Sequence, residues 1–192
     1  MEGEQPVGAV ILAAGASRRF GSPKQLAVVD GRTLLEHVID AATAATLGPV
    51  AAVVPVWLTR PARYDDPRLR WVRNPFPERG MSSSLRLGLD AIRDEVGAAI
   101  VLLGDQLVGP TLVDEILAAR GGKPLIATEA GGVLAPPLLI ERSHFALVDG
   151  LSGDIGLRET LRDNPTIVHA VSAAEHPGDV DTPSDLERFT RP

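Results

Sequence analysis

Short runs of consecutive apolar residues alternate along this chain with segments whose apolar residues recur every three or four positions. The first kind of pattern predicts buried strands of a parallel sheet, and the second predicts amphipathic helices. The strand candidates are residues 7–13 (VGAVILA), 50–56, 69–72, 98–103 (AAIVLL), 125–128, 134–140 and 166–171. In the second of these, Pro55 is expected to weaken the strand or to place it near a sheet edge.

The helix candidates lie mostly between these strands. Residues 33–36 (TLLE) fit a capping box that opens a helix to about Thr46, with an apolar face of Leu34, Leu35, Val38, Ile39 and Ala42. The serines at 82–84 are predicted to cap a helix through Ile92. Further helices are predicted at 110–120, 143–151, 154–162 and 182–189. The pattern predicts an α/β fold with a mostly parallel sheet and helices on both faces, whose ligands bind beyond the carboxyl ends of the strands.

Composition narrows the class of protein. A chain of 192 residues suits a single domain, and we expect residues 1–192 to form one. The net charge of −6 argues against broad binding to nucleic acid or to an anionic membrane. There is no cysteine, which excludes disulfides and thiolate chemistry. The opening residues MEGEQP do not resemble a signal peptide and no run reaches the length of a membrane span, so a cytoplasmic protein is expected.

The sequence LAAGASRRFGSPKQL, residues 12–26, follows the first predicted strand directly. It matches neither the Walker A spacing nor GxGxxG. A glycine-bearing loop after a buried strand can aim backbone N–H groups at a triphosphate while Arg19 and Lys24 neutralise it, although an ordinary basic surface turn explains the same residues. Lys24 is one of only two lysines among 19 basic residues, and its compact ammonium suits a phosphate contact.

Two further stretches carry candidate chemistry. Asp105 follows the strand at 98–103 directly, where it could bind Mg²⁺ together with nucleotide phosphates or serve only as a turn residue. Asp181, in the DVD run, is a second acid of the same ambiguous kind. Ser82, Ser83 and Arg86 open a helix, where they could contact a nucleotide or simply cap the helix.

Five blocks in order resemble the MobA/MocA-like nucleotidyltransferases, namely LAAGASRRFGSPKQL, GMSSSLRLGL, LLGDQ, GDIGLR (153–158) and DVDTPSDL (179–186). This resemblance implies a Rossmann-like three-layer α/β sandwich of the nucleotide-diphospho-sugar transferase type. It also implies transfer of a nucleotidyl group from a nucleoside triphosphate with Mg²⁺ and release of pyrophosphate. The Ala13–Ala14 pair resembles the cytidylyl type, which joins CMP from CTP to molybdopterin and can hand the product to a molybdoenzyme or its chaperone.

The resemblance also implies roles for individual residues. The nucleotide would be bound by Leu12, Ala13, Ala14, Gly15, Ser17, Arg19, Lys24, Ser82, Ser83 and Arg86. Lys24, Arg19 and Asp105 would be catalytic, with Arg19 and Lys24 offsetting charge on the pyrophosphate. Asp105 and Asp181 would hold the metal. Asp154 and Arg158 would shape the acceptor side, unless they form a structural salt bridge.

The chain departs from the family pattern at two places. Leu107 stands where relatives commonly have proline, and Ala135 stands where they commonly have histidine before a proline. The second change removes a polar group from the acceptor region. Three function classes therefore stay open: a nucleotidyltransferase for molybdopterin or another acceptor such as a sugar phosphate, a MocA-like NAD(P)H-dependent oxidoreductase, and a non-catalytic nucleotide-binding protein.

Overall fold

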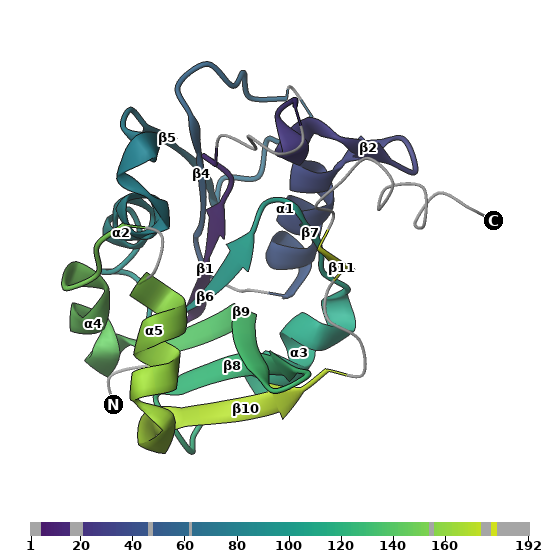
Figure 1. Cartoon of the computed structure of the whole chain (residues 1–192). Helices are drawn as coiled ribbons and strands as arrows, with labels where there is room; N and C mark the ends of the chain where they lie inside the picture. The colour runs from purple at the N-terminus through teal and green to yellow at the C-terminus, as the bar shows by residue number, and fades with distance from the viewer. Residues whose placement is uncertain are drawn as a thin grey trace.

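A computed structural model describes residues 5–15, 21–45, 48–61, 63–153, 156–173 and 178–179 of the chain. Its centre is a seven-stranded sheet in the order β10-β8-β9-β6-β1-β4-β5 (Figure 1). The strands are β1 (Val7–Leu12), β4 (Val50–Pro55), β5 (Leu69–Asn74), β6 (Ala98–Leu103), β8 (Leu125–Ala130), β9 (Val133–Glu141) and β10 (Val168–Ser172). β9 runs antiparallel to β6 and β8, whereas the other neighbouring pairs are parallel, so the predicted mostly parallel sheet is confirmed.

The apolar runs of the sequence form the middle of this sheet because both of its faces are covered. All six residues of β4 are buried, and the strand lies between β1 and β5. Of the two expectations for Pro55, a weakened strand is wrong, whereas a place near a sheet edge is confirmed, because β4 is the neighbour of the edge strand β5. Pro55 is the last residue of β4, so its missing N–H falls where the ladder ends.

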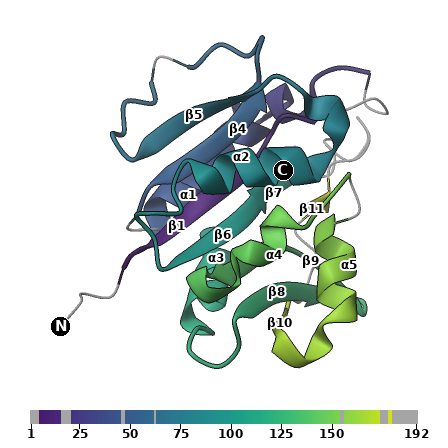
Figure 2. The same ribbon diagram turned by 90° about the vertical axis from the view of Figure 1, so that its left-hand side faces the viewer.

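Helices cover both faces and complete a three-layer sandwich (Figures 1 and 2). α1 (Leu34–Ala45) and α3 (Pro110–Ala118) share one apolar cluster with residues of the sheet that include Ile11 and Ile100. α2 (Met81–Asp90), α4 (Ala146–Asp149) and α5 (Gly156–Asp163) lie on the other face. There the cluster includes Val10, Leu85 and Leu161. Successive residues of β1 thus serve opposite layers, as the period of a strand requires.

Two of the predicted helix starts have different outcomes. The capping box of α1 is confirmed, because the Thr33 N–H donates to Glu36 Oε2 at 2.7 Å and the Glu36 N–H donates to Thr33 Oγ1 at 3.2 Å. The prediction that serines cap α2 is wrong. The N-cap is Gly80 with φ of 89°, and no side chain caps the helix. The serines fall inside the first turn, where Ser82 and Ser84 are buried.

The remaining elements are short. β2 (Val28–Val29) and β3 (Arg32–Thr33) form a hairpin, and β7 (Gln106–Leu107) pairs antiparallel with β11 (Gly178–Asp179). The 3-10 turns are η1 (Lys24–Leu26), η2 (Pro77–Arg79), η3 (Arg142–His144) and η4 (Pro165–Ile167). The helix predicted at 143–151 is divided between η3 and α4, and the helix predicted at 182–189 lies outside the described residues. Across the described ranges, none of the helices has the length and apolarity that crossing a membrane requires.

The order β5-β4-β1-β6 places the first strand of the chain in the middle of the sheet, with later strands added on each side. Strand order therefore reverses at β1, and the carboxyl end of β1 is the point where such folds bind ligands. On the α2 side, Gly88 allows the helix to approach closely. A Cβ at Gly88 would lie 2.4 Å from a methyl carbon of Val10.

Candidate active site

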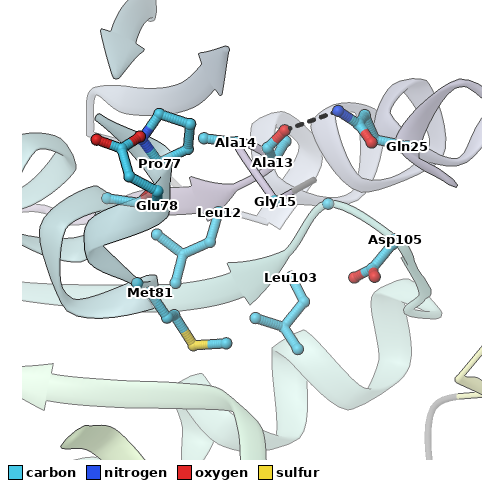
Figure 3. A pocket seen from close by; sticks show the side chains of 13 residues that line it. Leu12, Ala13, Ala14, Gly15, Gln25, Pro77, Glu78, Met81, Leu103 and Asp105 are labelled. Atoms are coloured by element: carbon cyan, nitrogen blue, oxygen red, sulfur yellow. Dashed lines mark hydrogen bonds between the residues drawn. The ribbon is translucent and has the colours of Figure 1, made fainter. Parts of the chain in front are cut away.

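A cavity of about 490 Å³ opens beyond the carboxyl ends of β1 and β6 (Figure 3). Its walls come from the end of β1, from the η2 turn and the start of α2, from the turn after β6, and from η1. The lining residues are Leu12, Ala13, Ala14, Gly15, Gln25, Pro77, Glu78, Gly80, Met81, Ser84, Leu103, Gly104 and Asp105. Of the residues that the sequence singled out, this cavity is lined by Leu12, Ala13, Ala14, Gly15 and Asp105, whereas Lys24, Ser82, Ser83 and Arg86 are not among its lining residues.

Small residues let the ends of β1 and β6 meet at this cavity. The Ala13 N–H donates to the Val53 carbonyl at 2.8 Å, and the Gly104 N–H donates to the Leu12 carbonyl at 2.9 Å. A Cβ at Gly104 would lie 2.5 Å from the Ala13 Cβ, closer than two carbons can approach. Gln25 then ties η1 to the same strand end, because its Nε2 donates to the Ala13 carbonyl at 3.1 Å. The turn that carries Asp105 is therefore held against the end of β1.

Lys24 and Asp105, 81 positions apart in the chain, form an ion pair at this edge of the sheet. The Lys24 Nζ lies 3.1 Å from Asp105 Oδ2. Lys24 is buried, whereas the Asp105 side chain keeps 36% of its surface exposed. The structure thus brings together the two residues predicted to act on phosphate and metal.

Asn74, the last residue of β5, fixes the opposite wall of the cavity. Its Nδ2 donates to Ser83 Oγ at 3.0 Å and to Ser84 Oγ at 2.9 Å, and its Oδ1 accepts from the Phe76 N–H at 2.8 Å. Because Asn74 is 1% exposed, these bonds are shielded from water and hold η2 to the start of α2.

The predicted contacts of α2 are arranged differently from the sequence expectation. Ser84 lines the cavity, whereas the Ser82 N–H donates to the Gly153 carbonyl at 3.1 Å and Ser83 Oγ donates to the Gly80 carbonyl at 2.8 Å. Arg86 turns toward α4: its Nη2 donates to the Leu151 carbonyl at 2.7 Å and to the Asp149 carbonyl at 3.3 Å. In this geometry Arg86 joins α2 to the segment after α4.

A second cavity of about 410 Å³ adjoins the first, since Met81 and Leu103 line both. Its other lining residues are Leu134, Ala135, Pro136, Leu157, Arg158, Glu159, Leu161 and Arg162. It therefore contains Arg158 and Ala135, the two described positions that the sequence associated with an acceptor. Arg162 pairs with Asp163 at 3.0 Å, while Arg158 makes no hydrogen bond or ion pair within the described part of the chain.

Four predicted residues, Ser17, Arg19, Asp154 and Asp181, lie outside the described residues. The pairing of β11 with β7 nevertheless brings the start of the DVD run to the strand that follows Asp105, with Asp179 opposite Gln106. The sequence reasoning missed Gln25, Glu78 and Gly104 as lining residues. Gln25 and Gly104 stand beside Lys24 and Asp105 in the quoted motifs, and this adjacency could have indicated that they line the cavity.

The donors at the site suit a magnesium ion brought by a nucleotide better than a metal site made by the protein alone. The described residues contain no group of three or more metal-ligating side chains. Mg²⁺ commonly binds one or two carboxylates and takes its other ligands from phosphates and water. The partly exposed carboxylate of Asp105 meets that requirement.

Comparison with known proteins agrees with this interpretation of the fold. The family model of the MobA-like NTP transferase domain matches residues 9–171, and the chain belongs to this family. The chain is 31% identical to nicotine blue oxidoreductase of Paenarthrobacter nicotinovorans over 94% of both chains. It is 28% identical to the purine catabolism protein PucB of Bacillus subtilis (strain 168) over 95% of both.

A solved structure extends the likeness to the whole fold. Rv0371c from Mycobacterium tuberculosis H37Rv has 25% identity and a TM-score of 0.82, covering 99% of each chain. A structure of Rv0371c complexed with manganese has a TM-score of 0.77 at 21% identity, covering 97% of this chain and 98% of the other. The expected nucleotidyltransferase-type Rossmann-like fold is confirmed.

Proposed function

We propose that this protein transfers a nucleoside monophosphate from a nucleoside triphosphate to a phosphorylated acceptor, as a single domain spanning residues 1–192. One observation carries the proposal: two adjoining cavities share a wall at Met81 and Leu103, beside the Lys24–Asp105 pair at the switch point of the sheet. Two adjoining sites are what a transfer between two substrates requires.

The larger cavity would hold the triphosphate. The N–H groups of the segment after Ala13, toward Ser17, would donate to the phosphates, because the Ala13 N–H already donates to the Val53 carbonyl. Lys24, with Arg19, would offset charge developing on the pyrophosphate. Lys24 is buried against Asp105, so an incoming phosphate competes with that carboxylate for its ammonium group.

Asp105, with Asp181 as a second ligand, would hold a divalent cation against the phosphates. Bound there, Mg²⁺ would neutralise phosphate charge and polarise the reacting phosphate. The manganese complex of Rv0371c supports the use of a divalent cation in this fold.

The smaller cavity would hold the acceptor, with Arg158 binding its phosphate and Asp154 shaping the same side. An oxygen of that phosphate attacks the α-phosphorus, a new P–O–P bond forms, and the bond to the β-phosphate breaks. The electron pair of the broken bond leaves with pyrophosphate. No nucleophile from the protein is needed.

For the finer identity we propose CTP as donor and a molybdopterin-type acceptor, with a molybdoenzyme or its chaperone receiving the product. The support is the resemblance at Ala13–Ala14 and in the ordered motifs. Ala135 lines the smaller cavity at the position where relatives commonly have histidine. Another phosphorylated acceptor, such as a sugar phosphate, is therefore the alternative to molybdopterin.

A second candidate is an oxidoreductase that uses NAD(P)H. It is favoured by the 31% identity to nicotine blue oxidoreductase over 94% of both chains. The absence of GxGxxG and the Lys24–Asp105 pair favour the transferase.

The deciding experiment measures pyrophosphate release from CTP, GTP, ATP and UTP with Mg²⁺, with and without molybdenum-loaded molybdopterin, and NADH oxidation in parallel. Release only from CTP together with that acceptor would support the full proposal. NADH oxidation without pyrophosphate release would replace the transferase by the oxidoreductase. Nucleotide binding without either reaction would identify a binding protein.

A further inference from the structure

The two ends of the larger cavity carry different chemistry. Figure 3 shows Gln25 and Asp105 at one end and Pro77 and Glu78 at the other. At the first end, the lining residue Asp105 pairs with the buried ammonium of Lys24. The second end carries Glu78, an exposed acid whose charge would repel a triphosphate. If the cavity holds a nucleotide, its phosphates lie at the Lys24 end and its base reaches toward Glu78.

Glu78 is available to a ligand, and the backbone that carries it is fixed. Within the described ranges its carboxylate makes no hydrogen bond or ion pair, and the neighbouring Arg79 guanidinium stacks over the Phe76 ring at 4.4 Å. The η2 turn is held on both sides. The Gly80 N–H donates to the Pro77 carbonyl at 3.1 Å, and Asn74 accepts from the Phe76 N–H at 2.8 Å.

A carboxylate in this position distinguishes bases by the edge they present. It accepts a hydrogen bond from an exocyclic amino group, such as N4 of cytosine, and repels a carbonyl oxygen such as O4 of uracil. From this geometry we propose that Glu78 selects an amino-bearing base and rejects uridine nucleotides. The inference rests on the proposed function and names the class of base that its nucleotide site would accept.

The test compares CTP with UTP in the wild-type protein and in Glu78→Gln. The amide of glutamine can accept a hydrogen bond from cytosine N4 or donate one to uracil O4. The variant should therefore no longer distinguish the two bases at this position. We expect wild-type kcat/KM to favour CTP and the CTP-to-UTP ratio to fall about tenfold in Glu78→Gln, mainly through improved use of UTP. Glu115→Gln is the matched control, because Glu115 is an exposed glutamate on α3, on the other face of the sheet. Its ratio should equal that of the wild type.

Titration calorimetry with the same two nucleotides separates this inference from the proposed function. If no variant releases pyrophosphate but binding shifts from CTP toward UTP in Glu78→Gln, the transferase proposal fails and the role of Glu78 stands. An equal CTP-to-UTP ratio in wild type and Glu78→Gln, in turnover or in binding, overturns the role of Glu78 and leaves the transferase proposal untouched. A preference of the wild-type protein for UTP would also overturn the role of Glu78.

Discussion

The ammonium nitrogen of Lys24 lies 3.1 Å from Asp105 Oδ2, joining the loop after β1 to the turn after β6. In the proposed reaction the two groups have different partners: Lys24 binds phosphate and Asp105 binds the cation. The pair keeps a buried ammonium neutralised until a nucleotide enters.

Replacing Asp105 with asparagine should reduce Mg²⁺-dependent turnover by about a hundredfold or more while the fold is retained. The amide preserves the shape of the side chain but not its negative charge, so the side chain would hold a divalent cation much more weakly. Pyrophosphate release and circular dichroism measure the two effects. Asp114→Asn, at an exposed position of α3, is the control. Near-normal activity of Asp105→Asn would remove Asp105 from the site.

Gly104→Ala should destabilise the protein and impair nucleotide binding together. The added Cβ would lie 2.5 Å from the Ala13 Cβ and 3.3 Å from the Leu12 carbonyl, and neither neighbour is a flexible side-chain end. Overpacking of this kind costs about 1–3 kcal/mol. Thermal unfolding and nucleotide titration check the prediction. Gly109→Ala, where no atom lies within 4 Å of the new Cβ, should unfold like the wild type. Equal Tm values for the two variants would contradict the close approach.

Arg86→Met tests whether this residue binds nucleotide or joins two segments of the fold. Because Arg86 donates to the carbonyls of Leu151 and Asp149, we expect a lower Tm and a KM for nucleotide within about twofold of wild type. A large rise in KM with an unchanged Tm would instead support the nucleotide contact that the motif implied.

Where a prediction depended on strands and their ends, the sequence was sufficient. The apolar runs at 98–103 and 7–13 have few alternatives to burial in a parallel sheet, and parallel strands end at one edge. Lys24 and Asp105 each follow one of these runs, so the order of residues alone predicts that they lie near each other.

Where a prediction depended on the direction of a side chain or on distant packing, the sequence was not sufficient. The motif containing Arg86 does not reveal that the last residue of α4 and the segment after it offer it carbonyls, 63 to 65 positions further on. The serines of α2 look like caps, but they lie inside its first turn, where Asn74 of β5 binds two of them, and Gly80 occupies the N-cap position. The smaller cavity arises only when β9 and α5 pack beside Met81, which no local pattern specifies.

Arg158→Gln should raise the KM for the acceptor about tenfold or more and leave the KM for the nucleotide unchanged. Arg158 lines the smaller of the two cavities and not the larger, and within the described residues no carboxylate neutralises it. Steady-state kinetics with each substrate varied in turn separates the two constants, and Arg158→Lys should restore part of the acceptor affinity. If both constants rise together, Arg158 does not belong to the acceptor side alone.

Tyr64, the single tyrosine of the chain, should titrate well above an ordinary phenol. Burial raises the pKa of Tyr64 to about 12, and the nearby Asp40 carboxylate, 3.1 Å from its hydroxyl, acts in the same direction against the lowering effect of Arg63. A tyrosinate absorbance titration of the folded protein should have its midpoint near 12, compared with about 10 for an exposed tyrosine.

The same shift predicts how stability changes with pH. Since the folded-state pKa lies above the unfolded value, the neutral phenol stabilises the fold fully below about pH 10, and this contribution is lost as pH rises toward 12. Tyr64→Phe lacks the titrating group. Its Tm should start below that of the wild type, because the hydrogen bonds to Asp40 and the Glu36 carbonyl are gone, and then fall less steeply between pH 10 and 12. Parallel Tm profiles of the two proteins over that range would show that Tyr64 titrates as an exposed phenol.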